Sequence, residues 1–365
     1  MLGLLPILVT IVKTKIDVAC EEVIHKLPEY ECSDSKPVGT GKESVVYLIK
    51  TKDTDILRTL KISKPDALRV EEEPQITYLK ALEDVPQVAT FFPPAHIISL
   101  ENDKYLLMVL EYGRYGDLEH LINIMPFHFK TDHLLFAFCL ELVKGLKEIH
   151  KRGIIHASIK PQNIIVMNDY SPKYIDFNWS VPINVPNYSR GDHLFNAPEV
   201  LLNRGHKVNW DASKDVYSLG GVFYYMIHGH VPFNGINRFF HRRAVERKKY
   251  LIKAGIRADF LEIIQKCMKW EPKDRATLDE IEELLYEAQD NTSPSKLPKD
   301  KVANLYNNSL EDCSLLDIDP LLLIIGSGCA ILGLLIIFII ISATRKSNNV
   351  PTVTRTELVT NDNNL

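Results

Sequence analysis

The sequence predicts an α+β fold with two lobes, a small β-rich lobe and a larger helical lobe, followed by one C-terminal transmembrane helix. Three observations carry this prediction. Runs of strand length dominate the first third of the chain, and helical periodicity dominates from residue 117 onward. Residues 320–342 contain more than 20 consecutive residues without a charge.

The chain opens on an apolar segment, "MLGLLPILVTIVKTK". Residues 2–12 have the length of a signal-peptide core, but no Lys or Arg precedes them, and "VAC" (18–20) is only a passable cleavage site. We therefore expect residues 1–20 to be a signal peptide or an uncleaved anchor, or alternatively a peripheral apolar strand.

The first lobe is predicted from three β-rich runs and one helix. The runs are "SVVYLIK" (44–50), "RTLKIS" (58–63) and "KYLLMVLEY" (104–112), with a polar turn between the first two. A helix at about residues 74–83 interrupts them.

The second lobe is predicted from two long helical patterns. Residues 132–152 place apolar side chains at 134, 135, 138, 142, 146 and 149, a stripe that ends at Gly153. Residues 215–229 are apolar nearly all round, which indicates a buried central helix. A crevice between a β-rich lobe and a helical lobe suits a nucleotide.

The C-terminal part is predicted to carry no second core. Residues 289–319 are polar and contain prolines, as a linker does, and 343–365 form a polar, disordered tail. At 1.5 Å per residue, residues 320–342 span a bilayer. Gly326 and Ala330 form a small-xxx-small pair, which is typical of a weak homodimer but also arises by chance. The folded unit is therefore about 30–288.

Composition excludes some functions. The chain has 365 residues and a net charge of −4, so nothing indicates nucleic-acid binding. Its densest basic stretch, residues 238–249, is most simply a solvated surface. The six cysteines do not have zinc-site spacing, so a metal centre of that kind is not expected.

Two glycines in "VGTGKESVVYLIK" (38–50) let backbone amides approach phosphates, although alone they fit an ordinary hairpin turn. Lys61 follows on the next strand, and "MVLEYG" (108–113) looks like the connection between the lobes. Five further motifs then arrive in order: "HASIKPQN" (156–163), "YIDFN" (174–178), "FNAPEV" (195–200), "DVYSLG" (215–220) and "DRAT" (274–277). This ordered series resembles the protein kinase family over about 250 residues, of the Ser/Thr-like type.

The resemblance implies binding of ATP and Mg²⁺. Lys61 corresponds to the lysine that reaches the α- and β-phosphates, and Lys160 to the lysine that contacts the γ-phosphate. Asp176 and Asn163 correspond to the two metal-binding groups. The implied nucleotide-binding residues are Gly39, Gly41, Val46, Lys61, Leu110, Glu111 and Tyr112.

Four residues have structural roles by the same resemblance. Glu199 and Arg275 correspond to a buried ion pair, Asp215 to the group that braces the catalytic loop from the central helix, and Leu110 to the back of the adenine pocket. Packing alone would explain these four.

One departure from the family concerns the reaction itself. The family's His-Arg-Asp has become His156-Ala157-Ser158, and the replaced aspartate is the group that accepts the proton of the substrate hydroxyl. Ser158 is neutral near pH 7 and cannot hold that proton. Ala157 also lacks the arginine that would hold a phosphorylated activation segment.

A second departure concerns the helix that normally supplies a glutamate to the lysine. Its register places Gln75 there, which can hydrogen-bond Lys61 but carries no charge, and Glu73 or Glu72 would substitute if the register slips. Two milder losses are Ser44 and Asn178 in place of family glycines.

The sequence therefore indicates a membrane-anchored pseudokinase that keeps ATP and Mg²⁺ binding and acts as a scaffold or allosteric partner of an unknown protein. The alternative is a weakly active or atypical Ser/Thr protein kinase that phosphorylates protein hydroxyls. A receptor-like domain with an empty cleft is a third reading.

Charges flanking the apolar segment bear on topology. Arg345, Lys346 and Arg355 follow it, whereas residues 305–319 contain four acids and no Lys or Arg. The positive-inside tendency favours a type I, single-pass protein with the kinase-like domain outside the cytosol. Sequons at Asn178, Asn187, Asn291 and Asn307 are compatible with this. The alternative is a tail anchor with a cytosolic kinase-like domain.

Overall fold

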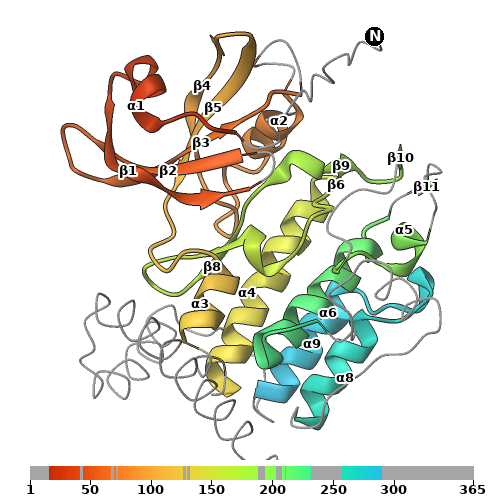
Figure 1. The fold of residues 1–365 in the computed structure, drawn as a ribbon. Coiled ribbons are helices and arrows are strands. Elements are labelled where there is room, and N and C mark those ends of the chain that lie inside the picture. Colours follow the sequence, from red (N-terminus) through yellow and green to blue (C-terminus); the bar gives the residue numbers. More distant parts are fainter. Residues whose placement is uncertain are drawn as a thin grey trace, which may run out of the picture. The chain divides into compact units, whose positions relative to one another are not determined.

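Two lobes make up the part of the chain that can be described, which confirms the predicted bilobal fold (Figure 1). The computed structural model describes residues 16–41, 44–66, 70, 73–125, 129, 132–187, 194–202, 208–209, 211–231 and 257–289. All of them lie in the first of two compact units, Met1–Tyr306, and the second unit is Asn307–Leu365.

Several sequence-based predictions fall outside the described residues. These are the transmembrane helix at 320–342, the linker from residue 290, the tail at 343–365, and the basic stretch at 238–249. Within the described ranges, no helix has both the length and the apolar character needed to cross a bilayer.

The small lobe is built on a five-stranded antiparallel sheet in the order β1-β2-β3-β5-β4 (Figure 1). Its strands are β1 (Tyr30–Thr40), β2 (Ser44–Thr51), β3 (Leu57–Ser63), β4 (Phe91–Leu100) and β5 (Asp103–Glu111). In β2, buried Val45, Tyr47 and Ile49 alternate with half-buried residues, so the period of two sends them to one face. That alternation fixes the register, because a slip of one residue would expose all three.

Each face of this sheet has its own cover. On one face lies α2 (Pro74–Ala81), whose Ile76 packs with Ala95, Leu106 and Met108. Pro74 occupies the first turn of α2, as the sequence predicted, because that position needs no backbone N–H donor. The other face is covered by the chain that precedes β1.

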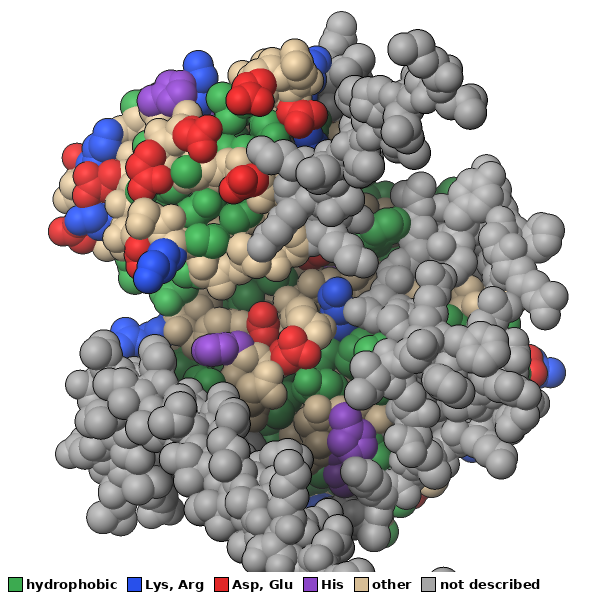
Figure 2. Space-filling model, in the orientation of Figure 1, with side chains coloured by type: hydrophobic (Ala, Val, Ile, Leu, Met, Phe, Trp, Pro, Cys, Tyr) green, Lys and Arg blue, Asp and Glu red, His purple; other side chains and the backbone are tan. Residues whose placement is uncertain are grey.

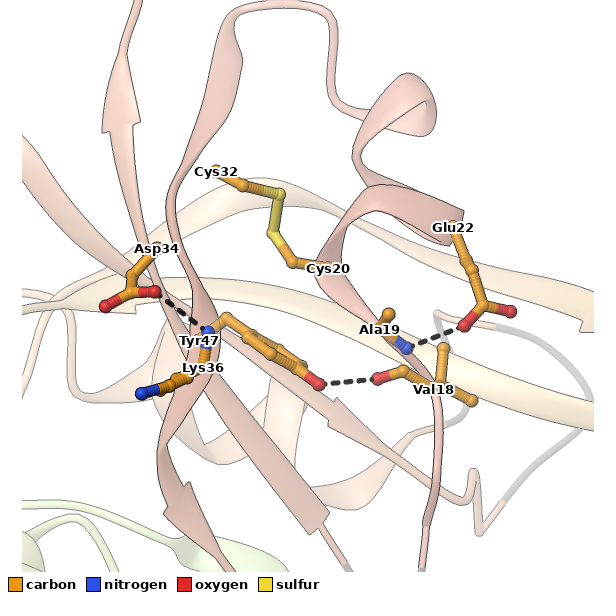
Figure 3. The surroundings of a disulfide bond; sticks show 8 residues. All are labelled: Val18, Ala19, Cys20, Glu22, Cys32, Asp34, Lys36 and Tyr47. Carbon is orange, nitrogen blue, oxygen red and sulfur yellow. Dashed lines mark hydrogen bonds between the residues drawn. A yellow bond between two sulfur atoms is a disulfide. The ribbon is translucent and has the colours of Figure 1, made fainter.

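This preceding segment, residues 16–29, is part of the small-lobe core. Its buried side chains join those of the sheet in one cluster and are Ile16, Val18, Cys20, Val23 and Leu27. The segment contains α1 (Cys20–Val23) and a 3-10 helix (Ile24–Lys26), and a disulfide joins Cys20 to Cys32 (Figure 3). Cleavage after Cys20 would therefore remove core side chains and half of a disulfide. Residues 1–15 lie outside the description, so a leader there stays a prediction.

The helical lobe is organised around a buried helix, α6. Every residue from Lys214 to Tyr224 is buried, which confirms the predicted central helix. The helices are α3 (Leu118–Ile124), α4 (Asp132–Lys151), α5 (Pro198–Leu201), α6 (Ser213–His228), α8 (Ala258–Cys267) and α9 (Leu278–Gln289). α4 packs against α9, and α6 packs against α8.

Short strands and turns of 3-10 helix connect these helices. The strands are β6 (Ile154–Ile155), β7 (Ile164–Val166), β8 (Pro172–Tyr174), β9 (Val181–Pro182), β10 (Pro186–Asn187) and β11 (Val208–Asn209). The 3-10 helices are Pro161–Asn163, Phe177–Trp179 and Pro272–Asp274. Two residues that the sequence singled out lie at these 3-10 helices: Asn163 ends the first, and Asp176 directly precedes the second.

Candidate functional site

A backbone loop between β6 and the 3-10 helix Pro161–Asn163 forms the centre of the site. Asp215, fully buried on α6, accepts hydrogen bonds from the backbone N–H groups of His156 (2.7 Å) and Ala157 (2.9 Å). Ala157 has a φ of 64°, in the left-handed region. Two bonds to one carboxylate hold this unfavourable backbone in place, which is the bracing role expected for Asp215.

The imidazole of His156 holds Ser158, two residues further along the chain. Its Nδ1 accepts a hydrogen bond from the N–H of Ser158 (3.3 Å), and its Nε2 lies 3.1 Å from the carbonyl oxygen of Ile175. Burial lowers the pKa of His156, so the ring is neutral with its proton on Nε2. The neutral imidazole therefore links the loop to the backbone at Ile175, in addition to the bracing by Asp215.

Ser158 lies at the position where the family has its proton acceptor. Its Oγ and its carbonyl oxygen both accept from Nδ2 of Asn163, at 2.9 and 2.8 Å. No carboxylate within the described ranges forms a hydrogen bond with Ser158. Asp169, a possible substitute, accepts from Ser171 in the turn between β7 and β8. Asp192, the other candidate, lies outside the described residues.

Lys61 and Asp176 form a direct ion pair between the lobes. The Lys61 ammonium on β3 lies 2.6 Å from Oδ1 of Asp176, and only 8% of its side chain is exposed. Burial by itself would raise the pKa of the Asp176 carboxyl, but the neighbouring Lys61, His156 and Lys160 outweigh it, and the pKa lies below its ordinary value. The carboxylate is thus ionised near neutral pH.

Helix α2 supplies no partner to Lys61 in the described part of the chain. Gln75 is buried on α2, but the hydrogen bond from Lys61 goes to Asp176 instead. Glu73 is also buried, at the residue before α2, and Glu72 lies outside the described residues. α2 packs against the 3-10 helix that follows Asp176. Lys61 therefore forms an ion pair across the lobes with Asp176 and not the hydrogen bond that Gln75 could have offered.

The residues implied to cover a nucleotide are adjacent on the sheet. Val46 on β2 is the cross-strand neighbour of both Gly39 on β1 and Lys61 on β3. The N–H of Gly41 donates to the carbonyl of Ser44 (2.8 Å), which closes the turn between β1 and β2. Figure 2 shows the surface hollowed between the sheet and the helical lobe below it.

The connection between the lobes is anchored by a side chain. Leu110 and Glu111 end β5, and Tyr112 follows. The Glu111 carboxylate accepts from the ammonium of Lys173 on β8 (2.7 Å) and from the backbone N–H and hydroxyl of Thr90 (3.0 and 3.1 Å). The sequence indicated Glu111 only as part of a nucleotide contact. Its partner Lys173 follows Asn163 by ten residues, and no motif pointed to it.

The predicted ion pair in the helical lobe is formed. The Arg275 guanidinium donates to both carboxylate oxygens of Glu199, at 2.8 and 2.6 Å. The Arg275 side chain is fully buried and also donates to the carbonyls of Ser213, Lys269 and Trp270. It therefore joins α5, α6 and the turn before α9.

Sequence reasoning missed Lys214, the residue before Asp215. It is 1% exposed, and its ammonium donates to the carbonyl of Ala157 (2.9 Å). Lys214 thus binds the backbone carbonyl oxygen of Ala157, and Asp215 binds its backbone N–H. The sequence did contain a signal for this role: Lys214 lies in the first turn of a largely apolar helix, a position that disfavours a cation.

Lys214 gives a prediction about pH. Burial lowers its pKa to about 8, although Asp215 and Glu199 act to raise it. The unfolded chain keeps its proton up to about pH 10.4 and the folded protein does not, so this group makes stability rise between about pH 8 and pH 10. Urea unfolding should give wild type a gain of roughly 3 kcal/mol over that range relative to Lys214→Met.

The matched control for this experiment is Lys269→Met, because Lys269 is exposed. Its pH dependence should equal that of wild type. If Lys214→Met kept the full rise in stability, Lys214 would not be the group that titrates.

A braced loop in the helical lobe, and a buried lysine on the opposing sheet that pairs with Asp176, have the arrangement of a two-lobed kinase-type fold. A family model for the protein kinase domain matches residues 32–286. The chain belongs to the protein kinase family, in its eukaryotic Ser/Thr branch, which confirms the resemblance that the ordered motifs indicated.

Several kinases are similar to this chain. Citron Rho-interacting kinase of Homo sapiens is 28% identical over 251 residues, which cover 63% of this chain and 12% of that protein. Aurora kinase of Saccharomyces cerevisiae is 24% identical over 279 residues, 71% of this chain and 72% of that protein. Sperm motility kinase 2B of Mus musculus is 30% identical over 207 residues, 56% of this chain and 40% of that protein. The chain thus spans far less than two thirds of the first and third of these relatives.

Proposed function

We propose that this protein is a membrane-anchored pseudokinase that binds ATP with Mg²⁺ and acts as a scaffold or allosteric partner of another protein. The observation that carries the proposal is Ser158. Its hydroxyl lies at the base position of a loop that is otherwise braced by Asp215 and His156, and it is hydrogen-bonded to the side-chain amide of Asn163, not to an acid.

The residues of the site fit Mg²⁺ and ATP, which protein kinase domains generally use. Asp176 is ionised, and Asn163 uses its amide N–H to hold Ser158, which leaves its side-chain oxygen without a donor among the described residues. A carboxylate and an amide oxygen are hard ligands that suit Mg²⁺ alongside phosphate oxygens. Bound Mg²⁺ would neutralise phosphate charge, and Lys61 would hold the phosphates.

The missing base lowers the rate but does not by itself abolish it. General-base catalysis is worth about 10²–10⁴-fold, and kinases turn over at roughly 1–100 s⁻¹. A chain that lacks only the base would retain a rate on the order of 10⁻⁴ to 1 s⁻¹. Losing the base therefore takes the rate to the lower end of the ordinary kinase range or below it.

A weakly active Ser/Thr protein kinase is the second candidate. The observation that favours it is the intact bracing of the loop, in which Asp215 holds two N–H groups and Lys160 lies near enough to Asp176 to lower its pKa. Phosphoryl transfer depends mainly on positioning and electrostatics. Ser158 would then orient the substrate hydroxyl without taking its proton.

Two measurements separate these candidates. A thermal-shift assay with ATP and Mg²⁺ tests binding, and transfer of a labelled γ-phosphate tests chemistry. We expect a clear shift together with transfer far below ordinary kinase rates. Transfer at ordinary rates that Asp176→Ala abolishes would overturn the pseudokinase proposal. No shift at millimolar ATP in a folded sample would overturn nucleotide binding.

The ion pair between Lys61 and Asp176 predicts how two variants differ. Asp176→Asn should keep ATP affinity in EDTA, because it frees Lys61, but should lose the increase in affinity that Mg²⁺ gives. Lys61→Met should weaken ATP binding by about 10- to 100-fold both with and without Mg²⁺, since hydrogen bonds to charged groups contribute about 1.5–3 kcal/mol. Titration calorimetry measures both. Equal loss in the two variants in EDTA would contradict the assignment of Asp176 to the metal.

Membrane anchoring by residues 320–342, with the kinase-like domain outside the cytosol, completes the proposal. Its supports are the apolar length of that segment, the basic residues after it, and the Cys20–Cys32 disulfide, because disulfides persist in oxidising compartments. Glycosidase treatment of the expressed chain tests it. An unchanged mobility would favour the tail-anchored arrangement.

A further inference from the structure

Residues 16–29, which we call the N-terminal cap, cover the face of the small-lobe sheet opposite α2. The match to the protein kinase family begins at residue 32. The cap therefore precedes the matched region, and Cys32 is the first residue of that region. The family resemblance therefore gives no role to the cap. Its function has to be inferred from its contacts.

The cap is attached to β2 by side chains and by backbone. The Tyr47 hydroxyl donates to the carbonyl of Val18 (3.0 Å) in a buried bond (Figure 3). Just after the end of β2, the Lys52 ammonium donates to the carbonyl of Pro28 (2.7 Å), and the Lys52 backbone N–H donates to the carbonyl of Glu29 (3.0 Å). Cap and β2 are thus joined near the middle of the strand and just after its end.

The disulfide attaches the cap to β1 as well. Cys32 pairs with Ile49 across β1 and β2, and Cys20 at the start of α1 is fully buried. β1 is an edge strand with mostly exposed side chains, and its register with β2 shifts on both sides of Pro37. Such a strand has few packing contacts of its own, so the bond at Cys32 is a major restraint on it.

The restrained strands carry the candidate nucleotide contacts. β1 continues from Cys32 to Gly39, and Gly39 pairs with Val46 on β2. Tyr47, which holds the cap, is the neighbour of Val46, and its side chain points to the opposite face of the sheet. The position of the cap is therefore coupled to the position of the glycine turn through two short stretches of backbone.

We propose that the Cys20–Cys32 disulfide makes the N-terminal cap a redox-dependent brace that sets the nucleotide affinity of the small lobe. Formation joins the two Sγ atoms as the two thiols lose two electrons and two protons to a protein or small-molecule disulfide, which becomes two thiols. A dithiol reverses the exchange. The inferred change in nucleotide affinity rests on the proposed function, because it requires that the protein bind a nucleotide. The inferred restraint of β1 and β2 by the disulfide does not rest on it.

The test uses the full chain in detergent, oxidised with glutathione disulfide or reduced with dithiothreitol. Reduction should lower the unfolding temperature by roughly 5–10 °C, since a disulfide closing a short loop stabilises a domain of this size by that order. It should weaken Mg²⁺-ATP binding by about fivefold or more, the usual scale of coupling between sites. Hydrogen exchange should become faster in residues 33–41.

The matched control is the double variant Cys20→Ser with Cys32→Ser. It should show the reduced values in both buffers, which excludes effects of the dithiol at other cysteines. A second variant, Tyr47→Phe, keeps the disulfide and removes the hydrogen bond to the carbonyl of Val18. We expect it to weaken nucleotide binding under oxidising conditions, so the test does not depend on the cysteine variant folding.

Four outcomes are distinguishable. Loss of stability, exchange protection and affinity together supports the brace. Unchanged affinity with lower stability overturns the coupling, and free thiols at Cys20 and Cys32 in the oxidised sample overturn the brace itself. If oxidised wild type binds no nucleotide, the proposed function fails, and exchange in residues 33–41 alone decides the brace: faster exchange on reduction supports it, and equal exchange overturns it.

Discussion

Ser158→Asp should raise γ-phosphate transfer by about 10²–10⁴-fold over wild type, the usual contribution of a general base. The new carboxylate would take the place of a hydroxyl that already accepts a hydrogen bond from Asn163, so the side chain enters a position that the loop prepares for an acceptor. Asp215 and His156 hold that loop in both proteins. Initial rates with a generic protein substrate and labelled ATP measure the change.

Ser158→Asn is the control, because it has nearly the size of Asp but cannot take a proton. Its rate should stay at the wild-type level. If wild type already turned over in the ordinary kinase range and Ser158→Asp changed nothing, another group would be the base. If Ser158→Asp bound nucleotide and stayed inactive, the missing base would not be the limiting defect.

Arg275→Met should destabilise the protein by about 3–5 kcal/mol, because it removes one partner of a buried ion pair. The Glu199 carboxylate would lose both of its hydrogen bonds to the guanidinium. The carbonyls of Ser213, Lys269 and Trp270 would lose a donor at the same time. Urea unfolding followed by tryptophan fluorescence gives the free-energy difference.

Lys266→Met serves as the comparison for this variant. Lys266 forms an exposed pair with Glu262 at 3.7 Å, and such pairs contribute about 0–1 kcal/mol. A loss below about 1 kcal/mol in Arg275→Met would show that the pair is replaceable by packing, as some buried ion pairs are.

Much of the fold could be predicted because the spacing of apolar residues along the sequence differs between helices and strands. The pattern expected for a helix at residues 132–152 corresponds to α4 (Asp132–Lys151), and the expected strand at 104–112 to β5. β4 was missed, since Pro93 and Pro94 argue against a strand. Its place at the edge of the sheet explains why prolines are tolerated there.

The arrangement of the site was harder to predict than its residues. The order of motifs located Lys61, Asn163 and Asp176, but sequence spacing could not tell that Lys61 pairs with Asp176 instead of Gln75. That choice depends on where α2 packs. The cap was missed for another reason: its first residues adjoin the apolar segment at 2–12 and were assigned with it to a leader ending at residue 20, and the spacing of 12 between Cys20 and Cys32 gave no signal of a disulfide.

Glu111 has a mechanical consequence for the molecule. Its carboxylate ties the segment joining the lobes to β8 through Lys173 and to the loop before β4 through Thr90. A hinge restrained in this way resists rotation of one lobe against the other, so the angle between the lobes should change little when a ligand enters. The protein would then respond to occupancy locally, without rigid-body opening and closing.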